Sequence, residues 1–452
     1  MNELSLSVLQ EAVSGGVAAF RAYIRLQPAG GTGTKVFPPT YSGGVYAMET
    51  RRITNAQDEF ENQSAVLLDS VQSQANRLEE CLRNAWEESR LRVPVIYSDF
   101  SEAAFEEASE HVMASVREIG RVTTFDAPHR IADAIFRDSI TADDVAFREA
   151  FARAFDANLR NATALFELCP AALVFGTWDS TGSRGGLGNK FPRALVSEIV
   201  GINAVAGVRT SSRLDPLAIS SKVPLYKRRE DNEGSDWTVL LSEAAVNDKG
   251  EPIAYESKSG KGNPSAANHS NVTPDIVRFS NKDISETNRK TPDLLRPGHD
   301  IEVGRLKPGG VTIDYALQTI VLSLPALRRL QFPVEGEQTA ERNRAARTVL
   351  AALGLVAIME QYQQGAFLRS RCDLVPETAE LTIERVRSAT VKDDDKFTLT
   401  PDEAIAIYDA AVAEAVELNL PWQTEAIALI PNPDLVGLVV ASRQFEFGEA
   451  QV

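Results

Sequence analysis

The chain has 452 residues, of which 43% are hydrophobic and 24% are charged. This ordinary globular composition excludes disorder over most of the length and supplies enough apolar material for a sizeable core. No apolar run reaches the roughly 18 residues of a membrane-spanning helix, and the first residues lack the pattern of a secretory signal, so we expect neither a membrane anchor nor export. Three widely spaced cysteines favour a reducing cytoplasm over a disulfide framework or a zinc site.

Acidic and basic residues are unevenly distributed. The chain carries 63 acidic and 47 basic residues, and the acidic excess is concentrated in residues 56–120 and 373–452. Residues 176–230 instead hold 9 basic and 4 acidic residues. A phosphate backbone would respond to this local excess, because screening confines electrostatic interactions to about 10 Å. The acidic segments taken alone are typical of a solvated surface.

The first half of the chain predicts one strand and several helices. Residues 20–26 alternate apolar and polar side chains, which predicts a half-buried strand. Residues 27–41 are rich in glycine and proline, which favours a long loop or an edge hairpin. Apolar residues at helical spacing predict a long helix over residues 63–92 and amphipathic helices over 101–119 and 141–165.

A polar, glycine-rich loop over residues 177–193 separates two further elements. The apolar run 171–176 has the length of a strand, and residues 194–200 have the pattern of a helix. Residues 204–209 favour another strand.

Residues 226–310 lack long periodicity, which indicates an irregular insertion around a strand at 237–241. The elements expected after it are a strand over 311–324, a long helix over 337–364, a strand over 381–386 and a helix over 401–418. Strands separated by unequal helical segments favour an α+β fold with an antiparallel sheet.

Two glycine-rich segments carry lysine but fail the tests for nucleotide motifs. Residues 30–35 (GGTGTK) end in Lys35 and lead to two prolines, whereas a P-loop must open a helix. The segment is either a turn without a ligand or a nucleic-acid backbone contact through Lys35. The loop around residues 182–190 combines Trp178 with the cations Arg184, Lys190 and Arg193. An aromatic side chain can stack on bases and the cations can bind phosphate, so we favour nucleic-acid binding over a plain surface loop.

A third polar segment lies in residues 70–77. Ser70, Ser73, Gln74 and Arg77 are three to four residues apart, so they are expected to share one helix face. Near a helix N-terminus such a face can bind an anion, although a merely solvated face is the alternative. The basic segment 208–213, with Arg209 and Arg213, is a further candidate for binding phosphate.

Catalysis has little support in the sequence. None of the four histidines lies in a recognisable motif, and neither HExxH nor GxSxG occurs. The acidic run 393–395 is typical of a solvated loop. We therefore expect no enzymatic activity, no cofactor and no metal.

Four blocks, residues 21–41, 69–80, 175–201 and 311–333, together resemble the backbone subunit of the type I-G CRISPR surveillance complex, formerly called type I-U. That subunit is a RAMP-superfamily protein of the Cascade assembly. The resemblance covers residues from about 20 to 215 and from 300 to 333. It implies an RRM-like, ferredoxin-like palm with large helical and loop insertions.

In the organisation that this resemblance implies, residues 1–225 form the first part of the palm with glycine-rich RNA-binding loops. Residues 226–300 form a finger-like or thumb-like insertion, and residues 301–452 complete the palm and add an acidic helical part. Several copies would polymerise along one CRISPR guide RNA and expose its bases to a target DNA strand without cutting nucleic acid. The other implied partners are further Cascade subunits, namely the large subunit and the subunit that caps or processes the guide end, and no membrane.

The resemblance also implies site residues. These are Lys35, Ser70, Gln72, Ser73, Gln74, Arg77, Trp178, Arg184, Lys190 and Arg193. The aromatic motifs with which ordinary RRM domains read RNA are not found, so loops would grip phosphates while guide pairing reads the sequence. Two alternatives remain: a metal-independent ribonuclease that processes the guide precursor with His129 or His111 as general acid or base, and a nucleotide-dependent enzyme using the glycine loops.

Overall fold

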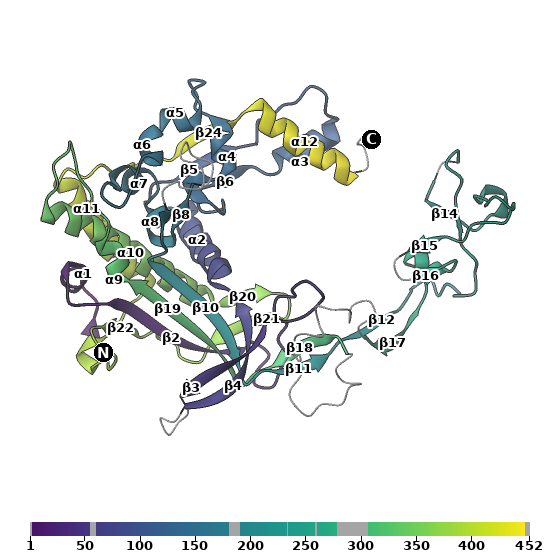
Figure 1. The fold of residues 1–452 in the computed structure, drawn as a ribbon, viewed down its shortest axis with the longest axis horizontal. Coiled ribbons are helices and arrows are strands. Elements are labelled where there is room, and N and C mark those ends of the chain that lie inside the picture. The colour runs from purple at the N-terminus through teal and green to yellow at the C-terminus, as the bar shows by residue number, and fades with distance from the viewer. Residues whose placement is uncertain are drawn as a thin grey trace. The chain divides into compact units, whose positions relative to one another are not determined.

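The computed structural model describes residues 2–54, 60–179, 190–232, 234–257, 260–277 and 306–447 (Figure 1). The chain divides into two compact units. Unit 1 comprises Met1–Thr34, Leu67–Ile202 and Asp314–Val452, and unit 2 comprises Lys35–Val66 and Asn203–Ile313. The elements mix helices with a largely antiparallel sheet, which confirms the α+β prediction. The expected boundaries after residues 225 and 300 stay predictions.

A mixed sheet forms the centre of unit 1. Its order is β1 (Asn2–Glu3), β23 (Lys396–Thr398), β22 (Ile383–Val386), β2 (Ala19–Pro28), β19 (Tyr315–Ser323) and β10 (Leu195–Ile202). The order continues to β4 (Phe60–Asp69), whose last three residues belong to unit 1. The hairpin of β20 (Ala366–Arg369) and β21 (Cys372–Pro376) pairs with the end of β2. Strands β1 and β23 pair in parallel, whereas the β23–β22, β22–β2, β2–β19, β19–β10, β2–β21 and β20–β21 pairings are antiparallel.

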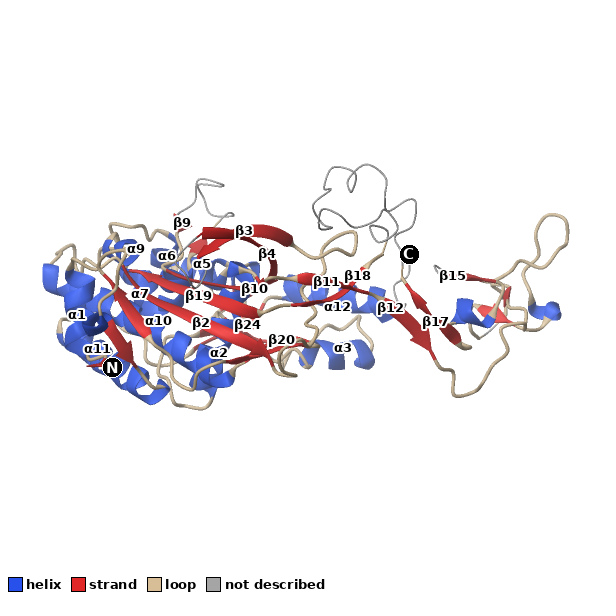
Figure 2. Ribbon diagram, turned by 90° about the horizontal axis from the view of Figure 1, so that it is seen from below, coloured by secondary structure: helices blue, strands red, loops and turns tan. Residues whose placement is uncertain are grey.

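Helices cover one face of this sheet, with α10 behind β2 and β19 (Figure 2). The helices concerned are α1 (Leu6–Ser14), α2 (Val71–Glu87), α8 (Pro170–Phe175), α9 (Leu324–Arg328), α10 (Ala340–Gln364) and α11 (Pro401–Glu417). The centre of α10 is buried all round because it lies between the sheet and α11. A Cβ at Gly354 would come within 3.2 Å of Leu322, so glycine allows α10 to approach the sheet closely.

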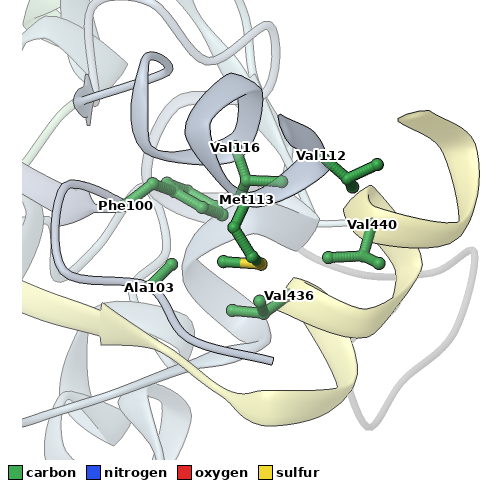
Figure 3. Close-up of a cluster of buried hydrophobic side chains, with 7 residues drawn as sticks. All are labelled: Phe100, Ala103, Val112, Met113, Val116, Val436 and Val440. Atoms are coloured by element: carbon green, nitrogen blue, oxygen red, sulfur yellow. The ribbon is translucent and has the colours of Figure 1, made fainter. Parts of the chain in front are cut away.

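A second, smaller lobe of unit 1 joins distant parts of the chain. Its sheet has the order β6 (Arg121–Thr123), β5 (Ile96–Asp99), β24 (Ile427–Pro431) and β7 (Ser139–Ile140). Helices α3 (Glu110–Arg117) and α12 (Pro433–Phe447) pack through an apolar cluster in which Val112, Met113 and Val116 meet Val436 and Val440 (Figure 3). The C-terminal part therefore completes a lobe that residues 96–140 begin.

Several predicted helices differ from the structure. The helix predicted over 63–92 is wrong at its start, because residues up to Asp69 extend β4 and α2 begins after Ser70, whose side chain caps it. The helix predicted over 101–119 shortens to α3. The one predicted over 141–165 breaks into α5 (Phe147–Ala150), α6 (Ala152–Phe155) and α7 (Thr163–Leu168), which follow α4 (Ala134–Arg137).

Two short elements have the opposite secondary structure to the one predicted: an expected strand is a helix, and an expected helix is a strand. Residues 171–176 form helix α8 rather than a strand, with Pro170 in the first turn. Residues 194–200 form strand β10 rather than a helix, because all of β10 pairs with β19. Periodicity alone does not separate a buried strand from a buried helix in so short an apolar run. The elements expected at 20–26, 204–209, 311–324, 337–364, 381–386 and 401–418 are confirmed in type, with 311–324 divided between β18 (Pro308–Thr312) and β19.

Unit 2 consists mainly of two-stranded ribbons. They are β11 (Val205–Val208) with β18 (Pro308–Thr312), β12 (Thr210–Arg213) with β17 (Val272–Ile276), β13 (Tyr226–Lys227) with β14 (Trp237–Thr238), β15 (Glu256–Ser257) with β16 (Gly260–Lys261), and β3 (Met48–Thr54) with β4. The strand predicted at 237–241 is confirmed only for its first two residues, since Leu241 begins a 3-10 turn. In the described part of the chain, no helix has both the length and the apolar character needed to cross a bilayer.

Candidate functional site

A groove of about 740 Å³ in unit 1 brings together residues from five separate segments. Gln72 and Asn76 of α2 form one part of its wall, and residues 128–130 form another. Residues 175–178 and 190–193 contribute a third part, and Arg329, which follows α9, contributes a fourth. A cavity of this volume is within the usual range of small-molecule and cofactor sites.

The groove is cationic although unit 1 as a whole is rich in acidic residues. Lys190, Arg193 and Arg329 line it together with His129, and Arg130, whose guanidinium is paired with the buried Glu79, lines it as well. None of the described residues that line the groove is an aspartate or a glutamate. A concave site of one charge sign concentrates ligands of the opposite sign, so the groove favours an anion.

Two short strands, here called the loop stems, flank the glycine-rich segment and line this groove. Strand β8 (Thr177–Trp178) pairs with β9 (Lys190–Phe191). This pairing places the ammonium of Lys190 4.2 Å from the centre of the Trp178 ring, a cation–π contact. The predicted site residue Arg184 lies outside the described residues.

Arg130 holds the start of the first stem, β8, through a hydrogen bond to the preceding residue, Gly176. Its guanidinium donates one hydrogen bond to the carbonyl oxygen of Gly176 at 2.7 Å and two to the buried carboxylate of Glu79. Gly176 has φ +82°, and a Cβ there would lie 2.9 Å from the carbonyl oxygen of Phe191. Glycine is therefore required where the chain turns from α8 into the stem.

Burial sets the electrostatics beneath the groove. Desolvation raises the pKa of Glu79 to about 7, against the opposing effect of the Arg130 guanidinium. Partial burial lowers the pKa of Arg193, and repulsion from the Arg130 guanidinium lowers it further. An arginine stays protonated regardless, so Arg193 is a cation with incomplete hydration, which an anionic ligand would stabilise.

The far end of the first stem, β8, is also held by an ion pair. Both terminal nitrogens of Arg148 donate to the carboxylate of Asp179, at 2.9 and 2.8 Å. Asp179 directly follows Trp178, so this two-point contact fixes the chain beside the aromatic ring.

The polar face predicted at the start of α2 is only partly open. Ser70 accepts a hydrogen bond from the backbone N–H of Ser73 and so caps the helix. The amide of Gln74 is buried: it donates to Asp69 at 2.6 Å and accepts from Ser197 and Gln318 at 2.8 and 2.9 Å. Gln74 therefore stabilises the fold and is not an open contact, in contrast to the expectation.

Arg77 has a structural position as well. It donates to Asp69 at 3.0 Å and to the carbonyl oxygens of Phe367 and Leu368 at 3.0 and 2.6 Å. These bonds fasten strand β20 to α2. Among the predicted residues of α2, Gln72 is the one that lines the groove.

In unit 2, Lys35 and the backbone of Arg209 lie next to the same two-stranded ribbon, β11 with β18. Val36 bridges to Val311 of β18, and Gly207 lies in β11, which pairs with β18. A Cβ on Gly207 would come within 2.6 Å of the Lys35 ammonium, so the lysine lies directly over the glycine. Arg209 follows β11, is exposed, and donates from its backbone to the carbonyl oxygen of Lys307 at 3.0 Å. Residues 35, 209 and 307 thus form a second basic region.

Arg213 does not share this open position. Its guanidinium donates to the carbonyl oxygens of Ser270 and His269 and to the side chain of Asn268. These bonds hold the turn before β17. Arg213 therefore has a structural role, and its expected phosphate contact stays a prediction.

Asn76 and Arg329 were not found by sequence reasoning. Asn76 carries a detectable signal, since it follows Gln72 by one helical turn. Arg329 carries none, because only tertiary packing brings the end of α9 to the groove.

Comparison with known families adds an independent finding. Residues 20–206 match the model of a family described as CRISPR-associated protein GSU0053 (Cas_GSU0053). The matched range includes Lys35, α2, both loop stems and every groove residue except Arg329. No curated protein matches the chain. The family match supports a CRISPR-associated protein.

Proposed function

We propose that this protein is a non-catalytic, guide-RNA-binding backbone subunit of a CRISPR surveillance complex. The observation that carries the proposal is the groove of unit 1, where cations and Trp178 meet without a lining carboxylate in an otherwise acidic unit. Cations and backbone N–H groups position a nucleic acid through its phosphates, and an aromatic ring accepts any base. Such a site suits a strand whose sequence is not fixed.

The finer form of the proposal follows the resemblance to the type I-G backbone subunit. Several copies polymerise along one guide RNA, the sheet of unit 1 acts as an RRM-like palm, and guide bases remain available to a target DNA strand. The partners in this form are the large subunit and the subunit at the guide end. The acidic net charge limits unspecific RNA binding, because only the local basic regions attract phosphate.

The test is co-expression with a repeat–spacer array and the partner genes, followed by nuclease treatment and sequencing of the retained RNA. We expect spacer-derived RNA that is protected along its length in regular steps. A preparation without nucleic acid, from cells that make the guide, would overturn the proposal.

A matched pair of variants links the retained RNA to the groove. Lys190→Ala/Arg193→Ala should reduce RNA retention and lower the slope of log affinity against log salt by about 0.7 per cation removed. Arg153→Ala/Arg160→Ala removes the same charge from exposed positions of unit 1 outside the groove and should leave the slope unchanged. Equal effects of the two double variants would show that net charge, and not the groove, controls binding.

One observation favours a second candidate, a metal-independent ribonuclease that processes the guide precursor. His129 lines the groove, where an imidazole would have access to a bound strand. Incubation of the pure protein with precursor RNA in a chelating buffer tests this function. Defined cleavage products that disappear in His129→Ala would replace the non-catalytic proposal, and intact RNA would remove the ribonuclease.

A further inference from the structure

We propose that the groove of unit 1 holds one complete nucleotide of a single strand, with its base stacked on Trp178 and the edge of the base at Gln72 and Asn76. This inference rests on the proposed function and deepens it, since phosphate contacts alone would need neither a ring nor amides. The ligand class is therefore a nucleotide unit within single-stranded RNA, with base and phosphate both bound.

The groove has room for a base as well as a phosphate. Its volume of about 740 Å³ exceeds what a phosphate group needs and lies within the range of sites that enclose cofactor-sized ligands. Phe175 and Phe191 lie in the wall but are buried, so the open apolar surface there is mainly that of Trp178. Apolar lining surface stabilises a bound base, whereas it offers no favourable interaction to a phosphate group.

Trp178 is available for stacking and is held in place. Its side chain is 39% exposed, although aromatic side chains of this size are usually well covered in folded proteins. Strand pairing with Lys190 and the adjacent Arg148–Asp179 pair restrict its backbone. The Lys190 ammonium lies on the ring at 4.2 Å, where it can neutralise a phosphate attached to the stacked nucleotide.

Gln72 and Asn76 provide hydrogen bonding without a strict preference for one base. Both are exposed on the groove side of α2, one turn apart. A side-chain amide carries an acceptor oxygen and a donor NH₂ group, so rotation of the amide presents either to a base edge. Two adaptable amides can therefore hold any of the four bases, as a guide-binding protein requires.

The experiment compares two strands of equal length and charge. One is oligouridylate, and the other is an abasic ribose-phosphate strand. The full chain should bind the base-bearing strand about 5- to 150-fold more tightly, the range expected for one base–aromatic stack. Trp178→Leu should abolish this preference and keep the salt slope, whereas Lys190→Ala should lower the slope and keep most of the preference.

Controls separate the failure of this inference from the failure of the proposed function. Trp178→Phe should retain part of the preference, because it keeps an aromatic face. Phe445→Leu removes an exposed aromatic side chain from α12 and should change nothing. Gln72→Ala/Asn76→Ala should weaken oligouridylate but not the abasic strand.

Four outcomes would overturn the inference. If the wild-type chain binds both strands equally while Lys190→Ala still lowers the slope, the groove binds phosphates alone and the proposed function stands. If Trp178→Leu keeps the preference, the base is bound elsewhere. If free uridine monophosphate binds as tightly as oligouridylate, the groove is a site for free nucleotides. If neither strand binds at all, the proposed function fails together with the inference.

Discussion

The guanidinium of Arg130 and the carboxylate of Glu79 form a two-point ion pair beneath the groove, with nitrogen–oxygen distances of 2.6 and 2.5 Å. Both side chains are buried, and Arg130 has φ +54°, a conformation that non-glycine residues rarely adopt. The third bond of Arg130, to Gly176, ties this pair to the loop stem. The support of the groove therefore depends on one buried arginine in an unfavourable backbone conformation.

Replacement of Arg130 by methionine should be strongly destabilising. At pH 8, above the pKa of about 7, it leaves the Glu79 carboxylate buried without its partner, and breaking such a pair typically costs about 3–5 kcal/mol. Urea unfolding of the full chain measures the change in the free energy of unfolding. Arg153→Met, at an exposed position, should change it by less than about 0.5 kcal/mol, and similar losses in both variants would contradict the prediction.

The raised pKa of Glu79 makes stability depend on pH. The folded protein holds this proton more tightly than the unfolded chain, whose glutamate has its ordinary pKa of 4.5. The contribution is complete below about pH 4.5 and is lost as the pH rises through about 7, with a total on the order of 3 kcal/mol. Urea unfolding between pH 4.5 and 8 should show this decline in wild type and a flatter profile in Glu79→Gln; parallel profiles would disprove it.

Gln72 and Gln74 should differ although they are two residues apart. Gln74→Leu removes the shared partner of Asp69, Ser197 and Gln318 in the sheet, which should cost about 1–3 kcal/mol of unfolding free energy. Gln72→Leu changes an exposed side chain and should leave stability within about 0.5 kcal/mol while weakening RNA binding. Thermal unfolding and RNA titration of both variants test this prediction. A loss of stability in Gln72→Leu together with a loss of RNA binding alone in Gln74→Leu would contradict it.

Arg209 and Arg213 of unit 2 should also differ in their roles although they are close in sequence. Arg213→Ala removes the bonds to residues 268–270, so hydrogen exchange in that turn should accelerate while the salt slope of RNA binding stays unchanged. Arg209→Ala should lower the slope by about 0.7 with little change in exchange. A loss of slope in Arg213→Ala, with normal exchange in the turn, would restore its predicted phosphate contact.

Gly207→Ala should act through Lys35. The new methyl group would take the place of the ammonium, which lies 2.6 Å from the Cβ position, and would lie 3.2 Å from the carbonyl oxygen of Gly309. The flexible lysine can move away, and the backbone oxygen must shift by a few tenths of an ångström. The expected result is a small change in melting temperature with the reduced salt slope of Lys35→Ala. Gly15→Ala, where a Cβ meets no neighbour within 4 Å, is the control, and full RNA affinity in Gly207→Ala would show that Lys35 needs no fixed position.

Prediction from the sequence succeeded where the local pattern was long. The helix over residues 337–364 and the strand over 20–26 were clear because their periodicity extends over several repeats. It failed at α8 and β10, where a short apolar run is compatible with either type and pairing with β19 decides. For the same reason it extended α2 backward into the end of β4.

The residue types available to the site can be read along the chain, because Trp178, Lys190 and Arg193 share one glycine-rich segment. Which polar residues remain open depends on the folded arrangement. Gln72 and Gln74 look equivalent along the chain, yet helix rotation points one into the groove and buries the other against Asp69. Arg329 joins the site only through packing of the segment that contains α9. Side-chain type is local information, but burial and neighbours are set by contacts between residues that are distant in sequence.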